Sequence, residues 1–280
     1  MSDLSISFKN LSFQIEQACL LTEVTGAFAA GQIHAIVGQN GAGKSTLLRC
    51  LTKEWPATSG EILFNQRNLN SLNFAELALD RAVLSQHQEV AFAFSVEQLV
   101  NLGFEAQQTS WSEATKQALL NKVLDATDIQ HLKKRDVLTL SGGEQKRAQL
   151  ARVLAQIWPV DFESEQAFSG KWLFLDEWSE ALDLKHQVHI GCLFRQLADK
   201  GLGVVMVSHD LNQVMQLTDT CTLLKAGRVL AQGVTQSVMT SENLTKALDI
   251  SVQVVFEAQS HQAVVVLKPL KPLNSIKSTV

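Results

Sequence analysis

The sequence has no tyrosine, only four cysteines and four prolines, and no long apolar run. Its cysteines are widely separated and show no C-x-x-C spacing, which argues against a disulfide framework or a zinc site and predicts reduced, mostly buried thiols in a cytosolic protein. Spanning a bilayer takes roughly 20 apolar residues, so we expect no membrane-crossing segment. Residues 1–4 have neither a basic region nor an apolar core, and we expect no signal peptide.

The sequence also lacks a large excess of charge of either sign. The 280 residues carry a net charge of −4, which gives no electrostatic reason to expect a nucleic-acid partner. A hydrophobic content of 46% with 19% charged residues is that of a soluble globular protein with an ample core.

One stretch carries most of the information. Residues 38–46, GQNGAGKST, fit the phosphate-binding pattern G-x-x-x-x-G-K-[ST] between the apolar run 33–37 and a helix that begins near Ser45. Glycines let backbone N–H groups turn inward, and the helix N-terminus adds partial positive charge. Lys44 would neutralise phosphate oxygens, and the Ser45 hydroxyl would bind Mg²⁺. The residues expected to bind a nucleoside triphosphate here are Gly38, Asn40, Gly41, Gly43, Lys44, Ser45 and Thr46.

The surrounding pattern predicts an α/β fold of the phosphate-loop NTPase class. Residues 3–37 alternate apolar and polar positions, which predicts several antiparallel strands, and strands alternating with helices from residue 141 imply a mainly parallel sheet. The first helix is expected to continue through residues 47–55. Apolar residues at helical spacing predict an all-helical subdomain over about 95–155. We expect one nucleotide-binding domain over 1–250, and two strands and a tail over 251–280.

An apolar strand at 172–175 ends in two acids, Asp176 and Glu177. At this place in phosphate-loop ATPases, one acid holds Mg²⁺, so Asp176 is the predicted metal ligand. Glu177 is the predicted general base for the attacking water. A plain strand end with solvated acids is the alternative.

The stretch 140–147, LSGGEQKR, has two compatible interpretations. Ser141, Gly142 and Gly143 offer a hydroxyl and free N–H groups to a phosphate at a helix start. Ser141 and Glu144 also have the spacing of a capping box.

Six motifs in this order resemble the nucleotide-binding subunits of ABC transporters, over about residues 3–250. They are Gly38–Thr46, Gln86 after a strand, Leu140–Arg147, Leu173–Glu177, Ala181–Asp183 and Ser208–Asp210.

The resemblance implies a mechanism. Two copies pair head to tail, and ATP is clamped between the phosphate loop of one and Ser141–Gly143 of the other. Gln86 would contact the metal or the attacking water and couple the site to the membrane partner. His209 would contact the γ-phosphate and hold Glu177, and Asp183 would belong to the loop that crosses the dimer interface.

Two features depart from the family pattern. The aromatic residue that stacks on adenine is commonly Tyr, which this chain lacks, so Phe13 is the candidate, with Phe8 or no stack as alternatives. Trp178 stands where Pro usually follows the catalytic acid; it removes a backbone restraint on Glu177 and is bulky beside the expected interface. This puts the rate of hydrolysis in doubt more than nucleotide binding.

Within the family, the chain is most similar to iron-chelate importers and, among these, to haem-import ATPases. The resemblance rests on the F-x-F-[ST]-V pattern at 92–96 after Gln86, on Asp183–Gln187 and on His209–Asn212. It implies transmembrane permease subunits, a periplasmic binding protein and a peripheral position at the cytoplasmic face of the inner membrane, without direct cargo contact. Iron-siderophore or cobalamin import, a soluble ABC-type ATPase and a nucleotide switch with weak hydrolysis stay as alternatives.

Overall fold

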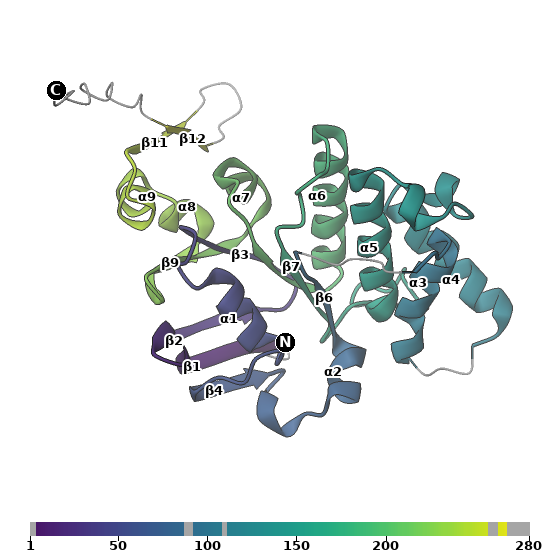
Figure 1. The fold of residues 1–280 in the computed structure, drawn as a ribbon, viewed down its shortest axis with the longest axis horizontal. Coiled ribbons are helices and arrows are strands. Elements are labelled where there is room, and N and C mark those ends of the chain that lie inside the picture. The colour runs from purple at the N-terminus through teal and green to yellow at the C-terminus, as the bar shows by residue number, and fades with distance from the viewer. Residues whose placement is uncertain (1–3, 87–91, 108–110, 257–262, 268–280) are drawn as a thin grey trace, which may run out of the picture.

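The computed structural model describes residues 4–86, 92–107, 111–256 and 263–267, and Figure 1 shows how their helices surround a central sheet. The strand order of this six-stranded sheet is β10-β9-β3-β8-β7-β6. All neighbours pair in parallel except β10, which runs antiparallel to β9 at the edge. The strands are β3 (Ile33–Gly38), β6 (Arg81–Leu84), β7 (Trp172–Asp176), β8 (Gly203–Val207), β9 (Thr220–Lys225) and β10 (Arg228–Val234).

A second, antiparallel sheet precedes the phosphate loop, with the order β2-β1-β4-β5. Its strands are β1 (Ser5–Ile15), β2 (Ala18–Ala29), β4 (Ser59–Phe64) and β5 (Arg67–Asn68). The predicted mainly parallel sheet and N-terminal antiparallel strands are therefore confirmed. The run 33–37 is not part of the antiparallel sheet, because β3 is buried along its whole length between parallel neighbours.

Helices cover the central sheet and form a separate layer on one side of it, labelled α3, α4 and α5 in Figure 1. The helices are α1 (Lys44–Leu51), α2 (Phe74–Asp80), α3 (Val96–Phe104), α4 (Glu113–Ala126), α5 (Gly142–Ile157), α6 (Leu184–Asp199), α7 (Leu211–Leu217), α8 (Thr235–Val238) and α9 (Ser241–Leu248). The first helix ends at Leu51 and not at residue 55, because Thr52 closes it and Lys53 takes a left-handed φ of 59°.

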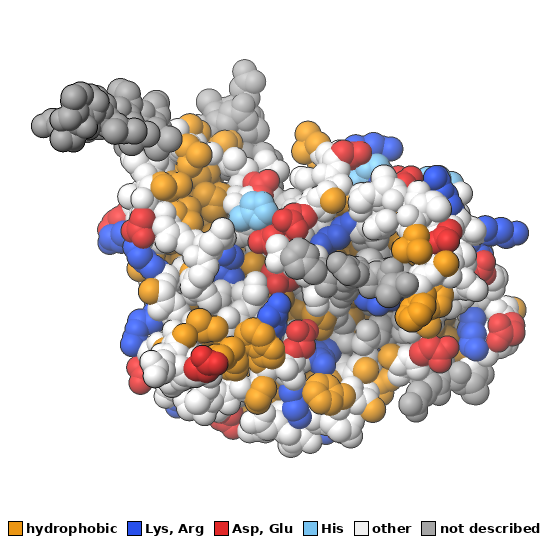
Figure 2. Space-filling model, viewed as in Figure 1, with side chains coloured by type: hydrophobic (Ala, Val, Ile, Leu, Met, Phe, Trp, Pro, Cys, Tyr) orange, Lys and Arg blue, Asp and Glu red, His pale blue; other side chains and the backbone are white. Residues whose placement is uncertain are grey.

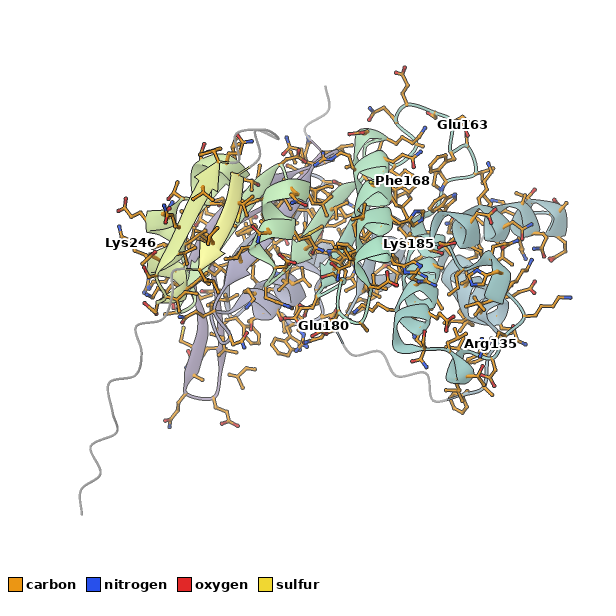
Figure 3. The ribbon with its side chains drawn as sticks, turned by 90° about the horizontal axis from the view of Figure 1, so that it is seen from above. Arg135, Glu163, Phe168, Glu180, Lys185 and Lys246 are labelled. Carbon is orange, nitrogen blue, oxygen red and sulfur yellow. The ribbon has the colours of Figure 1, made fainter. Side chains whose placement is uncertain are left out.

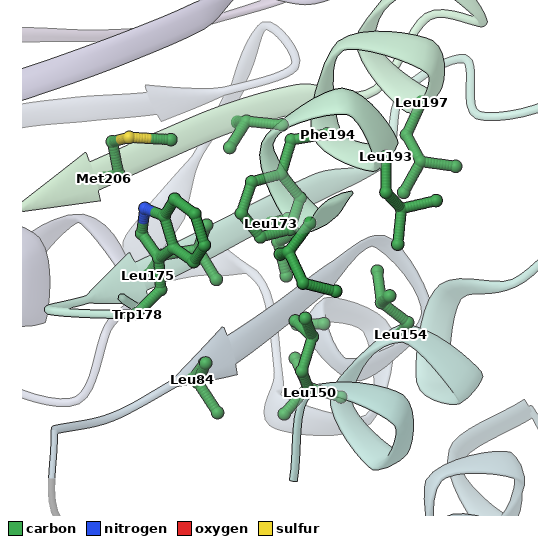
Figure 4. Packing of buried hydrophobic residues seen from close by; sticks show 14 of the residues in the cluster. Leu84, Leu150, Leu154, Leu173, Leu175, Trp178, Leu193, Phe194, Leu197 and Met206 are labelled. Carbon is green, nitrogen blue, oxygen red and sulfur yellow. The ribbon is translucent and has the colours of Figure 1, made fainter. Parts of the chain in front are cut away.

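The core that fixes the catalytic strands lies between the central sheet and helices α5 and α6. Figure 4 shows Leu173 and Leu175 of β7 packed with Leu150 and Leu154 of α5 and with Phe194 of α6, all of them buried. None of the helices in the described part of the chain is long and apolar enough to cross a membrane.

A two-stranded sheet, β11 (Val252–Phe256) and β12 (Ala263–Leu267), follows α9, and the two strands fall within the predicted range 251–268. The Asn212 side chain on α7 holds β12 by accepting from the Val265 backbone N–H at 2.8 Å and donating to the Val265 carbonyl at 3.4 Å. The predicted tail from residue 268 lies outside the described residues. The domain boundary at residue 250 stays a prediction.

The contact of α3 with α5 depends on a glycine. A Cβ atom at Gly103 would lie 2.1 Å from the Arg152 carbonyl oxygen and 2.9 Å from the Ala155 Cβ. We therefore expect Gly103→Ala to lower the free energy of unfolding by about 1–3 kcal/mol, as overpacked substitutions do, measured by urea denaturation.

Gly191 in α6 is the matched control, because a Cβ there would make ordinary contacts of 3.7 and 3.8 Å with Leu217. Gly191→Ala should leave stability unchanged or raise it by about 0.5–1 kcal/mol, since glycine is unfavourable inside a helix. Equal stability losses in the two variants would contradict the packing explanation.

His34, on β3, is a buried neutral histidine. Its Nε2 bonds the Ala29 carbonyl at 2.8 Å, and its Nδ1 bonds the Thr220 hydroxyl. Burial lowers the pKa of His34 from 6.5 to about 4. Because the folded-state pKa lies below the unfolded value, the stability linked to His34 is fully present above about pH 6.5 and is lost as the pH falls toward 4.

The linkage relation predicts a loss of about 2 kcal/mol from this group between roughly pH 7 and pH 5. His34→Gln, which does not titrate, should show a correspondingly smaller pH dependence in urea denaturation at the two pH values. The same pH dependence in both proteins would rule out His34 as the cause.

Candidate nucleotide-binding site

The phosphate loop joins the end of β3 to the start of α1. Gly41 and Gly43 have φ values of 79° and 99°, in the left-handed region that glycine tolerates. A Cβ at Gly43 would also lie 2.7 Å from the Leu20 carbonyl oxygen. The loop is therefore a compact turn that opens directly into the N-terminus of α1, where backbone N–H groups are free for an anion.

Lys44 lies folded across this loop. Its Nζ donates to the carbonyl oxygens of Gly38 and Gln39, each at 2.9 Å. Burial lowers the pKa of Lys44, and the nearby Glu177 and Asp176 oppose that shift. The ammonium group is thus positioned beside the space that a phosphate group would enter.

Ser45 and Asp176 meet at the predicted metal position. The Ser45 hydroxyl donates to the Asp176 carboxylate at 3.3 Å, and Asp176 is 4% exposed at the end of β7. A hydroxyl and a carboxylate in contact are a donor set of the kind that Mg²⁺ takes, with phosphate and water oxygens as its other ligands.

Glu177 lies at the centre of the predicted catalytic group. Its Oε2 accepts a hydrogen bond from Gln86 Nε2 at 2.7 Å, and its Oε1 lies 3.7 Å from His209 Nδ1. Burial raises the pKa of Glu177, and a hydrogen bond with Glu180 and the repulsion between the two carboxyl groups raise it further. Its φ of 51° is a strained backbone conformation for a residue other than glycine.

Most of these residues line one open cavity of about 690 Å³, whereas Asp176, which contacts Ser45, is not part of its lining. Figure 3 labels Glu180, which belongs to this cavity, on the connection between β7 and α6. The remaining lining comes from the phosphate loop and from the ends of β6, β7 and β8. The lining residues are Asn40, Gly41, Gly43, Lys44, Ser45, Thr46, Gln86, Glu177, Glu180 and His209. The structure thus brings together most of the residues predicted from separate motifs.

The Ser141–Gly143 stretch does not line this cavity. Ser141 caps α5, and its backbone N–H and hydroxyl each donate to Glu144 at 2.8 Å, so the capping box is present. A Cβ at Gly143 would lie 2.9 Å from the Ala181 carbonyl oxygen. Ser141 and Gly142 are exposed, so the other interpretation of this stretch, phosphate binding, is also compatible with the geometry.

Asp183 caps α6 and also lies outside the cavity. Its Oδ1 accepts from the His186 backbone N–H at 2.9 Å and lies 2.8 Å from His186 Nδ1. Its hydrogen bonds to the His186 backbone and side chain lower the pKa of Asp183.

Phe13 does not lie at the cavity either. It is 7% exposed, and its ring stacks on Trp55 with centroids 5.2 Å apart and planes inclined by 13°. Arg49 covers Trp55 in turn, 4.5 Å from its ring centroid. With its ring packed against Trp55 and buried, Phe13 offers no open face to an adenine, and the predicted stacking role has no support from this geometry. Phe8, the alternative, is buried against Phe28.

Trp178, which was expected beside the dimer interface, is buried in the core of the subunit, and its position relative to that interface stays a prediction. The side chain is 1% exposed and packs edge-on against Phe194 with ring centroids 5.0 Å apart. Figure 4 shows it inside the core, among Leu175, Met206 and Phe194. Its bulk is therefore accommodated within the subunit.

Two further residues face the catalytic acids and do not follow from the motif pattern. The first is Glu180, whose side chain forms a hydrogen bond with that of Glu177. The second is Lys146 on α5. Burial lowers the pKa of Lys146, and the negative charges of Glu180, Asp176 and Glu177 oppose that shift. The sequence signal that could have identified Glu180 is its position as a carboxylate three residues after Glu177. In the structure, a 3.4 Å hydrogen bond from the Glu180 N–H to the Glu177 carbonyl closes the turn between them.

Comparison with known proteins identifies the family. Residues 21–160 match the sequence model of the family described as "ABC transporter". Curated relatives described as "Hemin import ATP-binding protein HmuV" align over nearly the whole chain. The chain belongs to the ABC transporter family. It is an ATP-binding subunit and the ATPase of a transport complex.

The relative from Escherichia coli O157:H7 is 39% identical over 94% of this ABC subunit and 99% of its own length. The relative from Bradyrhizobium diazoefficiens is also 39% identical, over 92% of this chain and 91% of its own. A metal-chelate type ABC transporter in an inward-facing conformation has a similar structure, with a TM-score of 0.76, 26% identity and coverage of 95% and 98%. The dimeric structure of a bacterial ABC transporter cassette shares the fold, with a TM-score of 0.70 and 23% identity over 82% of this chain and 98% of that one.

The contacts of Glu177 generate a test of the catalytic site. Glu177→Gln keeps the volume and the neighbours of the side chain but removes the base, so ATP turnover should fall by about 10²–10⁴-fold, as loss of a general base does. ATP affinity, followed with a fluorescent analogue, should change little.

Glu165→Gln is the matched control, since Glu165 is exposed and does not line this cavity. It should retain most of the turnover. If Glu177→Gln turned over within a few fold of the unmodified protein, Glu177 would not be the base.

Proposed function

We propose that this ABC subunit is the energy-coupling ATPase of a haem importer. Two observations together carry the proposal. The first is the cavity lined by Lys44, Ser45 and Glu177, with Asp176 in contact with Ser45. The second is the likeness, over nearly the whole chain, to relatives described as hemin import proteins. Iron-siderophore and cobalamin import are the alternative cargoes, because the cargo passes through the membrane partner and not through this chain.

In the proposed site, the Ser45 hydroxyl and the Asp176 carboxylate, with Gln86 in the same site, would hold Mg²⁺. The ion neutralises phosphate charge when it is bound. Lys44 would bind the phosphate oxygens as well, and the position of its ammonium group over the loop supports this role.

Glu177 would take the proton of the water that attacks the γ-phosphate. Its raised pKa makes it a stronger base than an exposed glutamate, and the 2.7 Å bond from Gln86 fixes the direction of its carboxylate. His209 would contact the γ-phosphate from the end of β8 while its Nδ1 lies 3.7 Å from Glu177. Gln86 would couple changes in this site to the membrane partner.

The cavity holds the phosphate loop and the base, whereas Ser141–Gly143 lies outside it. A second copy, placed head to tail, would supply its own Ser141, Gly142 and Gly143 to the γ-phosphate, and Asp183 would lie where the two copies cross. The proposed assembly has two copies on two transmembrane permease subunits at the cytoplasmic face of the inner membrane, with a periplasmic binding protein delivering the cargo.

The decisive experiment isolates this ATPase with its own permease, by a tag on the chain, and reconstitutes the complex in liposomes with ATP on the ATPase side. With the binding protein present, we expect ATP-dependent uptake of haem and little uptake of a ferric siderophore or cobalamin.

The matched control is the same complex with Glu177→Gln, which should bind ATP and transport nothing. Uptake of a ferric siderophore or cobalamin in place of haem would overturn the cargo assignment and leave the ATPase assignment standing.

A further inference from the structure

Two exposed hydrophobic surfaces lie on either side of the segment 209–212. The first, which we call the α6 ridge, consists of Leu184 and Val188, one helical turn apart at the start of α6 and 76% and 60% exposed. Large apolar side chains this exposed, in adjacent positions on one helix face, are a feature of interaction surfaces.

The second surface, which we call the hairpin pocket, is a cavity of about 640 Å³ between the phosphate loop and the C-terminal hairpin. Leu211, Leu248, Ile250, Val265 and Leu267 contribute its apolar wall. Ile250 and Leu267 are 43% and 63% exposed. Figure 2 shows hydrophobic side chains gathered at the upper left of the view, near the strands labelled β11 and β12 in Figure 1.

The hairpin pocket is continuous with the nucleotide site. Asn40 and His209 line both cavities, so a partner that covers the nucleotide cavity also meets the hairpin pocket. The α6 ridge follows directly after Asp183, the residue proposed to lie where two copies cross. Both apolar surfaces are therefore placed along the face proposed for the head-to-tail dimer.

The pocket wall is also fixed before any partner arrives. Asn212 holds β12 through two hydrogen bonds to Val265, and Gln39 of the phosphate loop donates to the Leu248 carbonyl. The Ser241 hydroxyl accepts from the Val254 backbone N–H at 2.8 Å on the neighbouring strand. A wall fixed in this way loses little conformational entropy when it is covered.

We propose that the α6 ridge of one copy inserts into the hairpin pocket of the second copy, so that Leu184 and Val188 pack on Ile250 and Leu267 across the dimer. A two-fold axis repeats this contact, because both surfaces belong to every chain. The C-terminal hairpin is then part of the ATP-dependent interface. The inference rests on the head-to-tail assembly proposed above.

The first test measures ATP-dependent dimerisation of the full chain by analytical ultracentrifugation, in the Glu177→Gln background. Leu184→Asp and Ile250→Asp each place a charge in the proposed contact and should weaken dimerisation by about tenfold or more, because each removes a buried aliphatic group. ATP binding by the monomer should be unchanged.

Val160→Asp is the matched control, since Val160 is 51% exposed and lines neither surface. It should dimerise like the parent. Unchanged dimerisation of both interface variants would overturn the inference alone, whereas absence of any ATP-dependent dimer in the parent would overturn the head-to-tail assembly as well.

The second test identifies the contact directly, in chains whose exposed thiols are removed by Cys19→Ser and Cys192→Ser. A tagged copy with Leu184→Cys mixed with an untagged copy with Leu267→Cys should form an intermolecular disulfide when ATP is added together with an oxidant such as copper phenanthroline, which takes up the two electrons. The pair Leu184→Cys and Val160→Cys should not.

Failure of the first pair to cross-link in a dimer that does form would refute the contact. A dimer that appears only after residues 268–280 are removed would show that the chain's own tail occupies the pocket, and would also refute it.

Discussion

The structure depends on the parallel pairing of β3, β8 and β7. Ile36 pairs with Val207, and Val207 pairs with Asp176, so the carboxyl ends of three strands reach the same edge of the sheet. The phosphate loop, His209 and Glu177 each follow one of these ends. In open α/β sheets, ligands bind at such an edge because loops from neighbouring strands converge there. A shift of one residue in this pairing would separate the base from the phosphate loop.

The core fixes this register. β7 and β8 are buried along their whole length, and the helices α5 and α6 pack over them. Trp178 belongs to this same core, so the residue next to the base is held by packing against Phe194. In this chain, burial of the Trp178 side chain replaces the restraint that a proline at this position would impose on the backbone of Glu177. The left-handed conformation of Glu177 persists because its surroundings determine it.

The site of a single copy holds one half of the groups that the proposed mechanism uses. Glu177, Gln86 and His209 are already close together, whereas the exposed Ser141 does not line the cavity of its own phosphate loop. Catalysis in the proposed dimer would then require closure of the two copies, because each nucleotide would be hydrolysed only when the partner copy covers it. The hairpin pocket extends the same face beyond the nucleotide, which gives the C-terminal strands a place in that closure.

Local chemistry determined much of this protein. Glycines in residues 38–46 specify a turn before a helix, Ser141 and Glu144 specify a helix cap, and the alternation of strands and helices specifies the parallel sheet; each follows from a few neighbouring residues. The tertiary structure decided the rest. Gln86 and Glu177 are 91 residues apart and meet only because β6 and β7 are neighbours. The predicted role of Phe13 lacks support because Trp55 lies over its ring, and Trp178 lies in the core because the packing of the chain has room for it. Burial and long-range contact arise from the packing of the whole chain, so no short stretch of sequence contains them.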